Sequence, residues 1–150
     1  MTQTALTREQ VTNAEPGTDL NVMVAEHVFG WKRIEGPEHD YDGPVEHREV
    51  LIPPNMSKAH AYAMMPPRGR VELSYFVNRH WSKDIAAAWG VLNIMKQYTF
   101  DLFWSEARQE SEQWVCIFTP NIDASKYYKV YAGSAPEAIC KAALLAVLDI

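Results

Sequence analysis

Five side chains in this sequence could together hold a small ligand. His80, Trp81, Ser82 and Asp84 offer a titratable ring, an aromatic plate, a hydroxyl and a carboxylate near the start of an expected helix. Trp31 is expected beside them. Such groups suit a ribose or an amine, and a helix N-terminus suits a phosphate, although the Asp84 carboxylate would repel it. Trp31, His80, Trp81, Ser82 and Asp84 are therefore the candidate ligand-binding residues.

The Ser82/Asp84 pair also has a purely structural interpretation, which we prefer. A serine at the N-cap accepts a hydrogen bond from the first turn, and an aspartate there suits the positive end of the helix dipole. Ser82 is predicted to be the N-cap of a helix over residues 82–97. Trp89 belongs to an apolar arc so wide that this helix is expected to be largely buried.

No other motif predicts a reaction or a metal site. Zinc ligands usually share a helix face or include cysteine partners. Neither pattern is found for the histidines His39, His47, His60 and His80. The acidic stretch at 38–43 lacks the later carboxylates of a calcium loop. Nucleophile, P-loop and dinucleotide motifs are missing from the sequence. We predict no metal and no cofactor. Whether the protein is an enzyme stays open, and the sequence favours a protein without enzymatic activity.

Composition indicates one globular domain. The chain has 150 residues, of which 47% are hydrophobic, and its net charge of −5 argues against a non-specific nucleic-acid binder. Its apolar runs are shorter than the roughly 18–20 residues that span a bilayer, so no membrane association is predicted. Cys116 and Cys140 lack metal-binding spacing and are expected to be reduced and buried, which favours the cytoplasm.

The last third of the chain has the clearest structural pattern. The alternating segments "FDLFWS", "WVCIFT" and "YYKVYA" predict three strands of an antiparallel meander. A final helix over residues 134–148 opens with a capping box formed by Ser134 and Glu137. Two earlier helices, over 19–30 and 82–97, complete the prediction. The fold class is α+β, an α/β sandwich whose antiparallel meander sheet is covered by three main helices.

The first half of the chain has weaker signals. Residues 1–17 are predicted to be a flexible tail with a short helical piece, and residues 18–150 a single domain. Asp19 is expected to be the N-cap of the first helix and Gly30 its stop. Within the proline-rich middle, "EHREVLI" and "RVELSYFV" are predicted to be strands.

Three stretches together resemble a known family. They are "LNVMVAEHVFGW" (20–31), "HWSKDIAAAWGVL" (80–92) and "YAGSAPEAICKAALLA" (131–146). In these patterns, and in the order of elements over residues 19–148, the chain resembles the phage ABA sandwich domain. The resemblance implies an α/β sandwich carried by phages or prophages and acting in the bacterial cytoplasm. It implies no established activity, and the chain departs from the pattern at Lys83 and over 36–72.

The functional hypothesis is a small phage or prophage accessory protein that acts as a binding or interaction module, with a host protein or a small nucleotide-like ligand as candidate partners. Its alternatives are a protein that sequesters a nucleotide-like or other small molecule, and a small enzyme. A homodimer through the C-terminal helix is also predicted, because Leu144, Leu145 and Leu148 flank the polar strip of that helix. In the competing interpretation, other segments cover these leucines.

Overall fold

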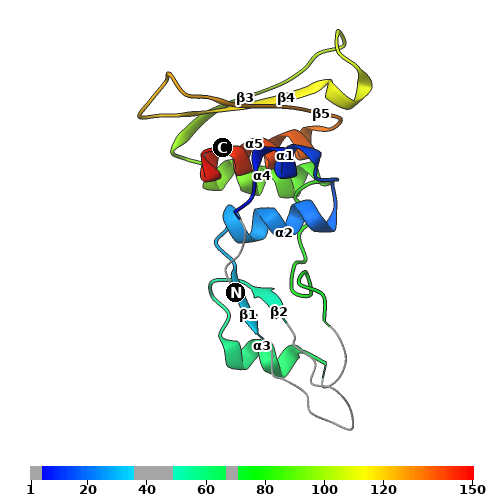
Figure 1. Cartoon of the computed structure of the whole chain (residues 1–150), viewed down its shortest axis with the longest axis vertical. Helices are drawn as coiled ribbons and strands as arrows, with labels where there is room; N and C mark the ends of the chain where they lie inside the picture. Colours follow the sequence, from blue (N-terminus) through cyan, green and yellow to red (C-terminus); the bar gives the residue numbers. More distant parts are fainter. Residues whose placement is uncertain (1–4, 36–48, 67–70) are drawn as a thin grey trace.

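The computed structural model describes residues 5–35, 49–66 and 71–150. Its elements in chain order are α1 (Arg8–Asn13), α2 (Thr18–His27), β1 (Lys32–Glu35), β2 (Glu49–Ile52), α3 (Lys58–Met64), α4 (Ile85–Ile94), β3 (Tyr98–Trp104), the 3-10 turn η1 (Glu110–Glu112), β4 (Trp114–Pro120), β5 (Tyr128–Ala132) and α5 (Ala135–Leu148). In Figure 1 the β3–β4–β5 sheet lies above α5 and α4, α2 follows below them, and β1, β2 and α3 form a separate lower layer. The predicted α+β class is confirmed.

The larger sheet is the predicted antiparallel meander. Its strand order is β3-β4-β5, and its register pairs Leu102 with Cys116 and Cys116 with Val130. Side chains of alternate residues point to the same face of a sheet. Cys116, Phe118 and Val130 therefore share the face that α5 covers, and all three are buried. Helices lie on one side of this sheet (Figure 1).

Helix α5 is the centre of the core. Ser134 is its N-cap, as predicted, and accepts a hydrogen bond from the Glu137 N–H at 3.3 Å. Leu144 and Leu145 are fully buried, so the prediction that they are exposed is wrong. The physical reason is that α5 contacts α1, α2 and α4 as well as β4 and β5. The exposed leucines on which a dimer through α5 was predicted are therefore not available on the surface.

Helix α4 is shorter than predicted and begins at Ile85. Its N-cap is Asp84, whose carboxylate accepts a hydrogen bond from the Ala86 N–H at 3.0 Å, so the prediction of Ser82 as N-cap is wrong. Trp89 is 48% exposed, which contradicts its predicted place in the core. Of the wide apolar arc, the side with Ala88 and Val91 is buried, because the helix meets the core along that side only.

The first long helix begins one residue earlier than predicted. Gly17, at φ 130°, is the N-cap of α2, and Asp19 lies in the first turn, so the prediction of Asp19 as cap is wrong. Gly30 has a φ of 73°, a conformation that costs glycine little. There the chain turns back, and the Trp31 N–H donates to the Ala25 carbonyl at 2.9 Å. The helix itself ends earlier than predicted, at His27 with Val28 as its C-cap, so Gly30 follows the helix end without being its direct stop.

The middle of the chain forms a small unit of its own. β1 pairs antiparallel with β2, and Ile34, Val50 and Ile52 form a second apolar cluster with α3. The prediction placed a strand over "EHREVLI", of which 49–52 is β2, but it missed β1 and α3. Residues 73–76 of "RVELSYFV" form turns, and no strand is formed over residues 71–77. They touch the strands through the Leu51 N–H, which donates to the Leu73 carbonyl at 3.1 Å.

The helical piece expected near the N-terminus is α1. Thr7 and Gln10 form a capping box, and Val11 is fully buried against the core. The Lys141 ammonium of α5 donates to the Thr12 carbonyl at 2.8 Å and pairs with Glu137 at 2.6 Å. These contacts attach α1 to α5. The division of the chain into a flexible tail and a domain at residue 18 stays a prediction.

We expect the protein to lose stability in alkaline solution because it has two buried thiols, Cys116 and Cys140. Desolvation raises the pKa of Cys116 from 9.0 to about 12, and burial also raises that of Cys140. Above pH 9 the unfolded chain therefore releases thiol protons that the folded chain retains. The free energy of unfolding is expected to fall with rising pH, by up to about 1.4 kcal/mol per pH unit for each thiol. Urea denaturation at a series of pH values measures this slope.

The variant Cys116→Val removes one of the two thiol protons whose release couples unfolding to pH. Its slope above pH 9 is expected to be smaller by up to about 1.4 kcal/mol per pH unit, whatever the substitution does to stability at pH 7. An unchanged slope would mean that the Cys116 thiol is not shielded from solvent.

Candidate functional site

The structure brings only some of the sequence-predicted site residues together. Trp81 is buried and stacks on Phe29, with ring centroids 4.9 Å apart, while Trp31 meets it edge-on at 6.2 Å. His80 and Asp84 are exposed on either side of the pair Trp81–Ser82. Binding of a ligand at these five residues stays a prediction, in which the half-buried Trp31 ring would offer the accessible aromatic surface.

The Ser82 hydroxyl is already engaged inside the protein. Ser82 is fully buried, and both its N–H and its hydroxyl donate to the Asn21 side-chain oxygen, at 3.0 Å and 2.8 Å. The Gly17 N–H donates to the Ser82 hydroxyl at 2.8 Å. This network ties the start of α2 to the segment before α4. Ser82 therefore has a structural role, though a different one from the predicted helix cap.

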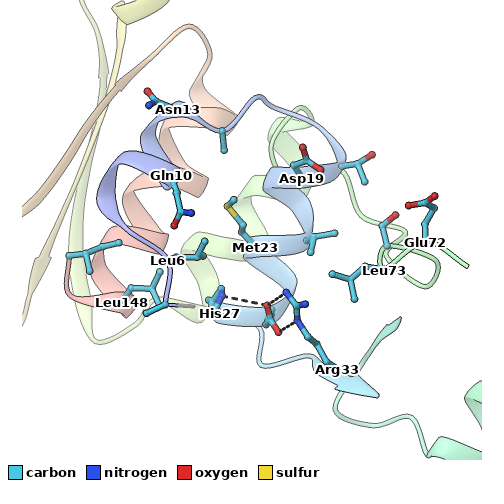
Figure 2. A pocket seen from close by; sticks show the side chains of 17 residues that line it. Leu6, Gln10, Asn13, Asp19, Met23, His27, Arg33, Glu72, Leu73 and Leu148 are labelled. Carbon is cyan, nitrogen blue, oxygen red and sulfur yellow. Dashed lines mark hydrogen bonds and ion pairs between the residues drawn. The ribbon is translucent and has the colours of Figure 1, made fainter. Parts of the chain in front are cut away.

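A pocket lies elsewhere, along the outer side of α2. It has a volume of about 890 Å³, within the range of small-molecule sites. Figure 2 shows α1 and the end of α5 on one side of it and the 72–74 segment and β1 on the other. Its lining residues are Ala5, Leu6, Gln10, Asn13, Ala14, Thr18, Asp19, Val22, Met23, Glu26, His27, Arg33, Glu72, Leu73, Ser74, Leu148 and Ile150.

The middle of the pocket is apolar. Met23, from the second half of α2, points into it between Leu6 on one side and Leu73 on the other (Figure 2). Leu148 from α5 continues this surface. Each of these four side chains is partly exposed and also packs against the main core. A methionine thioether adapts to ligands of different shape, so this surface can take an apolar body.

One end of the pocket carries an ion-pair network around Arg33. The Arg33 guanidinium binds both carboxylate oxygens of Glu26, at 2.6 Å and 3.0 Å, and reaches Glu49 at 3.0 Å. The His27 ring lies 3.5 Å from Glu26. The hydrogen bond to Glu26 is the main cause that raises the Arg33 pKa above its usual value. Because Arg33 pairs with Glu26, the charges of these two pocket-lining residues offset each other.

The other end of the pocket is acidic. Asp19 and Glu72 are both exposed there (Figure 2). Over the described ranges 5–35, 49–66 and 71–150, neither carboxylate forms an ion pair. Thr18 and Ser74 add hydroxyl groups to the same lining. Two carboxylates without cationic partners favour a cation in this part of the pocket.

Sequence reasoning missed this pocket for a structural reason. Its walls come from α1, α2, the turn segment at 72–74 and the end of α5, which are far apart in the chain. The sequence contained only part of a signal for the ion-pair network. Glu26 and His27 are adjacent in the chain, but their partner Arg33 follows the turn at Gly30 that brings β1 back to α2.

Neither a metal centre nor a membrane span is found in the part of the chain that the structure describes. No group of three or more His, Cys, Asp or Glu side chains there could hold a metal ion. No helix within the same residues is long and apolar enough to cross a bilayer. The acidic stretch at 38–43, with His39, and His47 lie outside the described residues.

A helix-covered antiparallel meander places the chain among the α/β sandwiches, and a family comparison makes the class specific. The model of the phage ABA sandwich domain matches residues 22–144. The chain therefore belongs to the phage ABA sandwich domain family, as its sequence patterns predicted. The match begins within α2, at residue 22, and includes most of α5. Curated proteins and solved structures gave no match.

Proposed function

We propose that this phage protein is a small-molecule binding module of the host cytoplasm and that the pocket along α2 holds its ligand. One observation carries the proposal: an opening of about 890 Å³ with an apolar middle and charged groups at its two ends, and a mostly apolar lining with a few polar groups is usual for a ligand site. The enzyme alternative has no comparable support, because Glu26, His27 and Arg33 satisfy one another and suggest no reaction.

The charges of the pocket favour a ligand with an apolar body and an amine. Met23, Leu6 and Leu73 would contact the body, and Asp19 and Glu72 would attract the ammonium group. A phosphate in the same place would be repelled by both carboxylates. The pocket therefore supports an amine-bearing ligand over a nucleotide-like one. A host protein that presents such a group would bind by the same chemistry.

Thermal denaturation with three matched probes tests this proposal. Phenethylamine, phenethyl alcohol and phenylpropionate share an apolar ring and differ in charge. A ligand that prefers the native state raises the melting temperature, so the amine is expected to raise it most and the carboxylate least. Equal shifts for all three probes, or none for the amine, would contradict the proposal.

The variant Glu72→Gln tests the role of charge directly. It removes one exposed carboxylate from the pocket and is expected to weaken binding of the amine about threefold to tenfold at low salt, with the difference shrinking as salt screens it. Glu106→Gln is the matched control, because Glu106 is exposed in the β3–β4 connection and does not line the pocket. If both variants bind alike, Glu72 does not contact the ligand.

A further inference from the structure

The outer edge of β3 has unpaired backbone groups. The hydrogen bonds at the two ends of the β3–β4 pair show which residues these groups belong to. The Ser105 N–H donates to the Gln113 carbonyl at 2.7 Å, and the Asn121 N–H donates to the Gln97 carbonyl at 2.9 Å. Because bonding alternates along an antiparallel strand, the odd-numbered residues of β3 point their backbone groups toward β4. Those of Phe100, Leu102 and Trp104 point away. Over the described residues, no backbone hydrogen bond reaches these outward groups.

The side chains of β3 leave the same edge unprotected. Phe100, Phe103 and Trp104 are 42%, 45% and 51% exposed and belong to both faces of the strand. Free edges are usually blunted by lysine, proline, a bulge or a covering segment. β3 has neither lysine nor proline, and Asp101 is its single charge. A strand of seven residues with this composition is a template for another strand.

We propose that β3 pairs antiparallel with β3 of a second copy of this chain, which joins two three-stranded sheets into one. The strand is self-complementary, as a two-fold interface requires. Around Leu102 the segment Phe100–Trp104 is symmetric in kind, with an aromatic residue two positions away on each side. A two-fold axis at Leu102 therefore sets Phe100 against Trp104 of the partner subunit, and each exposed ring covers the other.

Charge selects this register over its neighbour. An axis at Asp101 would set two carboxylates directly opposite each other, which destabilises strand pairing. An axis at Leu102 sets Asp101 against Phe103 of the partner subunit instead. It also aligns the outward backbone groups of Phe100, Leu102 and Trp104 with their counterparts as hydrogen-bonded pairs. The pairing uses none of the pocket residues, so it is independent of the proposed function.

Sedimentation velocity over a dilution series tests the dimer. The unmodified chain is expected to dimerise. The double variant Phe100→Lys/Trp104→Lys sets ammonium groups against each other across the axis and is expected to be a folded monomer, since both side chains are about half exposed. Ile122→Lys is the control: Ile122 is 99% exposed in the β4–β5 turn, and its variant should dimerise like the unmodified chain.

The variant Phe103→Lys tests the register. It sets an ammonium group opposite Asp101 of the partner subunit twice per dimer and is expected to tighten the dimer about fivefold, an effect that salt reduces. Three results would overturn the proposal: a monomer at every concentration of the unmodified chain, a dimer that persists in the double variant, or a dimer weakened by Phe103→Lys. This last variant also keeps the proposal testable if the double variant does not fold.

Discussion

Leu145→Glu is expected to unfold the protein. Leu145 is fully buried in α5, where the sheet covers one side of the helix and α1, α2 and α4 cover the other. A carboxylate there loses its hydration without gaining a partner, and the expected cost is more than about 4 kcal/mol. Domains of this size are stable by roughly 5–15 kcal/mol. Circular dichroism is expected to show loss of most of the native helix or a melting temperature lowered by ten degrees or more, at about 2–4 °C per kcal/mol.

Val147→Glu is the matched control for this prediction. Val147 lies two residues further along the same helix and is 37% exposed. Its variant is expected to stay folded and to lose about 1 kcal/mol or less. A Leu145→Glu protein that melts like the control would show that α5 presents Leu145 to solvent, and would restore the dimer surface predicted on this helix.

Asn21→Ala is expected to be the most destabilising polar substitution. The Asn21 side-chain oxygen is buried and accepts from both the N–H and the hydroxyl of Ser82. Its removal leaves the Ser82 N–H without an acceptor and leaves the hydroxyl only the longer bond to the Gly17 carbonyl at 3.4 Å, and a buried donor without an acceptor costs about 1–3 kcal/mol. We expect a loss of about 3 kcal/mol in urea denaturation. Ser82→Ala keeps the Ser82 N–H bonded to Asn21 and is expected to cost less.

Asp84→Ala completes the comparison. It removes the exposed N-cap of α4 and is expected to cost about 1 kcal/mol. The order of the losses is therefore Asn21→Ala, then Ser82→Ala, then Asp84→Ala. If Ser82→Ala and Asn21→Ala cost no more than the cap, the buried network contributes nothing beyond local capping.

Periodicity in the sequence predicted those elements whose pattern is both long and local. β3, β4 and β5 are apolar and aromatic runs between polar turns, and α5 has its own N-cap, Ser134, so these four elements were predicted nearly at their true bounds. Short elements were missed. β1 has four residues and α3 has seven, and neither has enough length to show a period.

Burial was harder to predict than the elements themselves. Trp89 and Leu145 both lie in wide apolar arcs, yet one is half exposed and the other fully buried. An apolar arc shows which side of a helix can be buried. How much of that side is buried depends on how many other elements pack against the helix. α5 has neighbours on all sides, whereas α4 packs chiefly on α5. That difference depends on contacts between distant segments, which a single helix pattern does not contain.

The candidate site could be predicted only as a set of residue types. Trp81 and Trp31 meet as expected, because Gly30 turns the chain back at the end of α2. The Ser82 hydroxyl was expected at a helix start and is instead bonded to Asn21, across 61 residues of chain. The pocket depends on α1 lying against α5, and its Asp19 and Glu72 carboxylates gave no sequence signal of their own.

Amide chemical shifts recorded during titration with phenethylamine test whether the pocket along α2 binds an amine-bearing ligand. We expect the shifting resonances to belong to the pocket: Leu6, Gln10 of α1, Asp19 and Met23 of α2, and Glu72 to Ser74. Phenylpropionate at the same concentration should shift the same resonances less. Shifts that gather instead at Trp31 and residues 80–84, with the pocket unchanged, would contradict the account and favour the site predicted from the sequence.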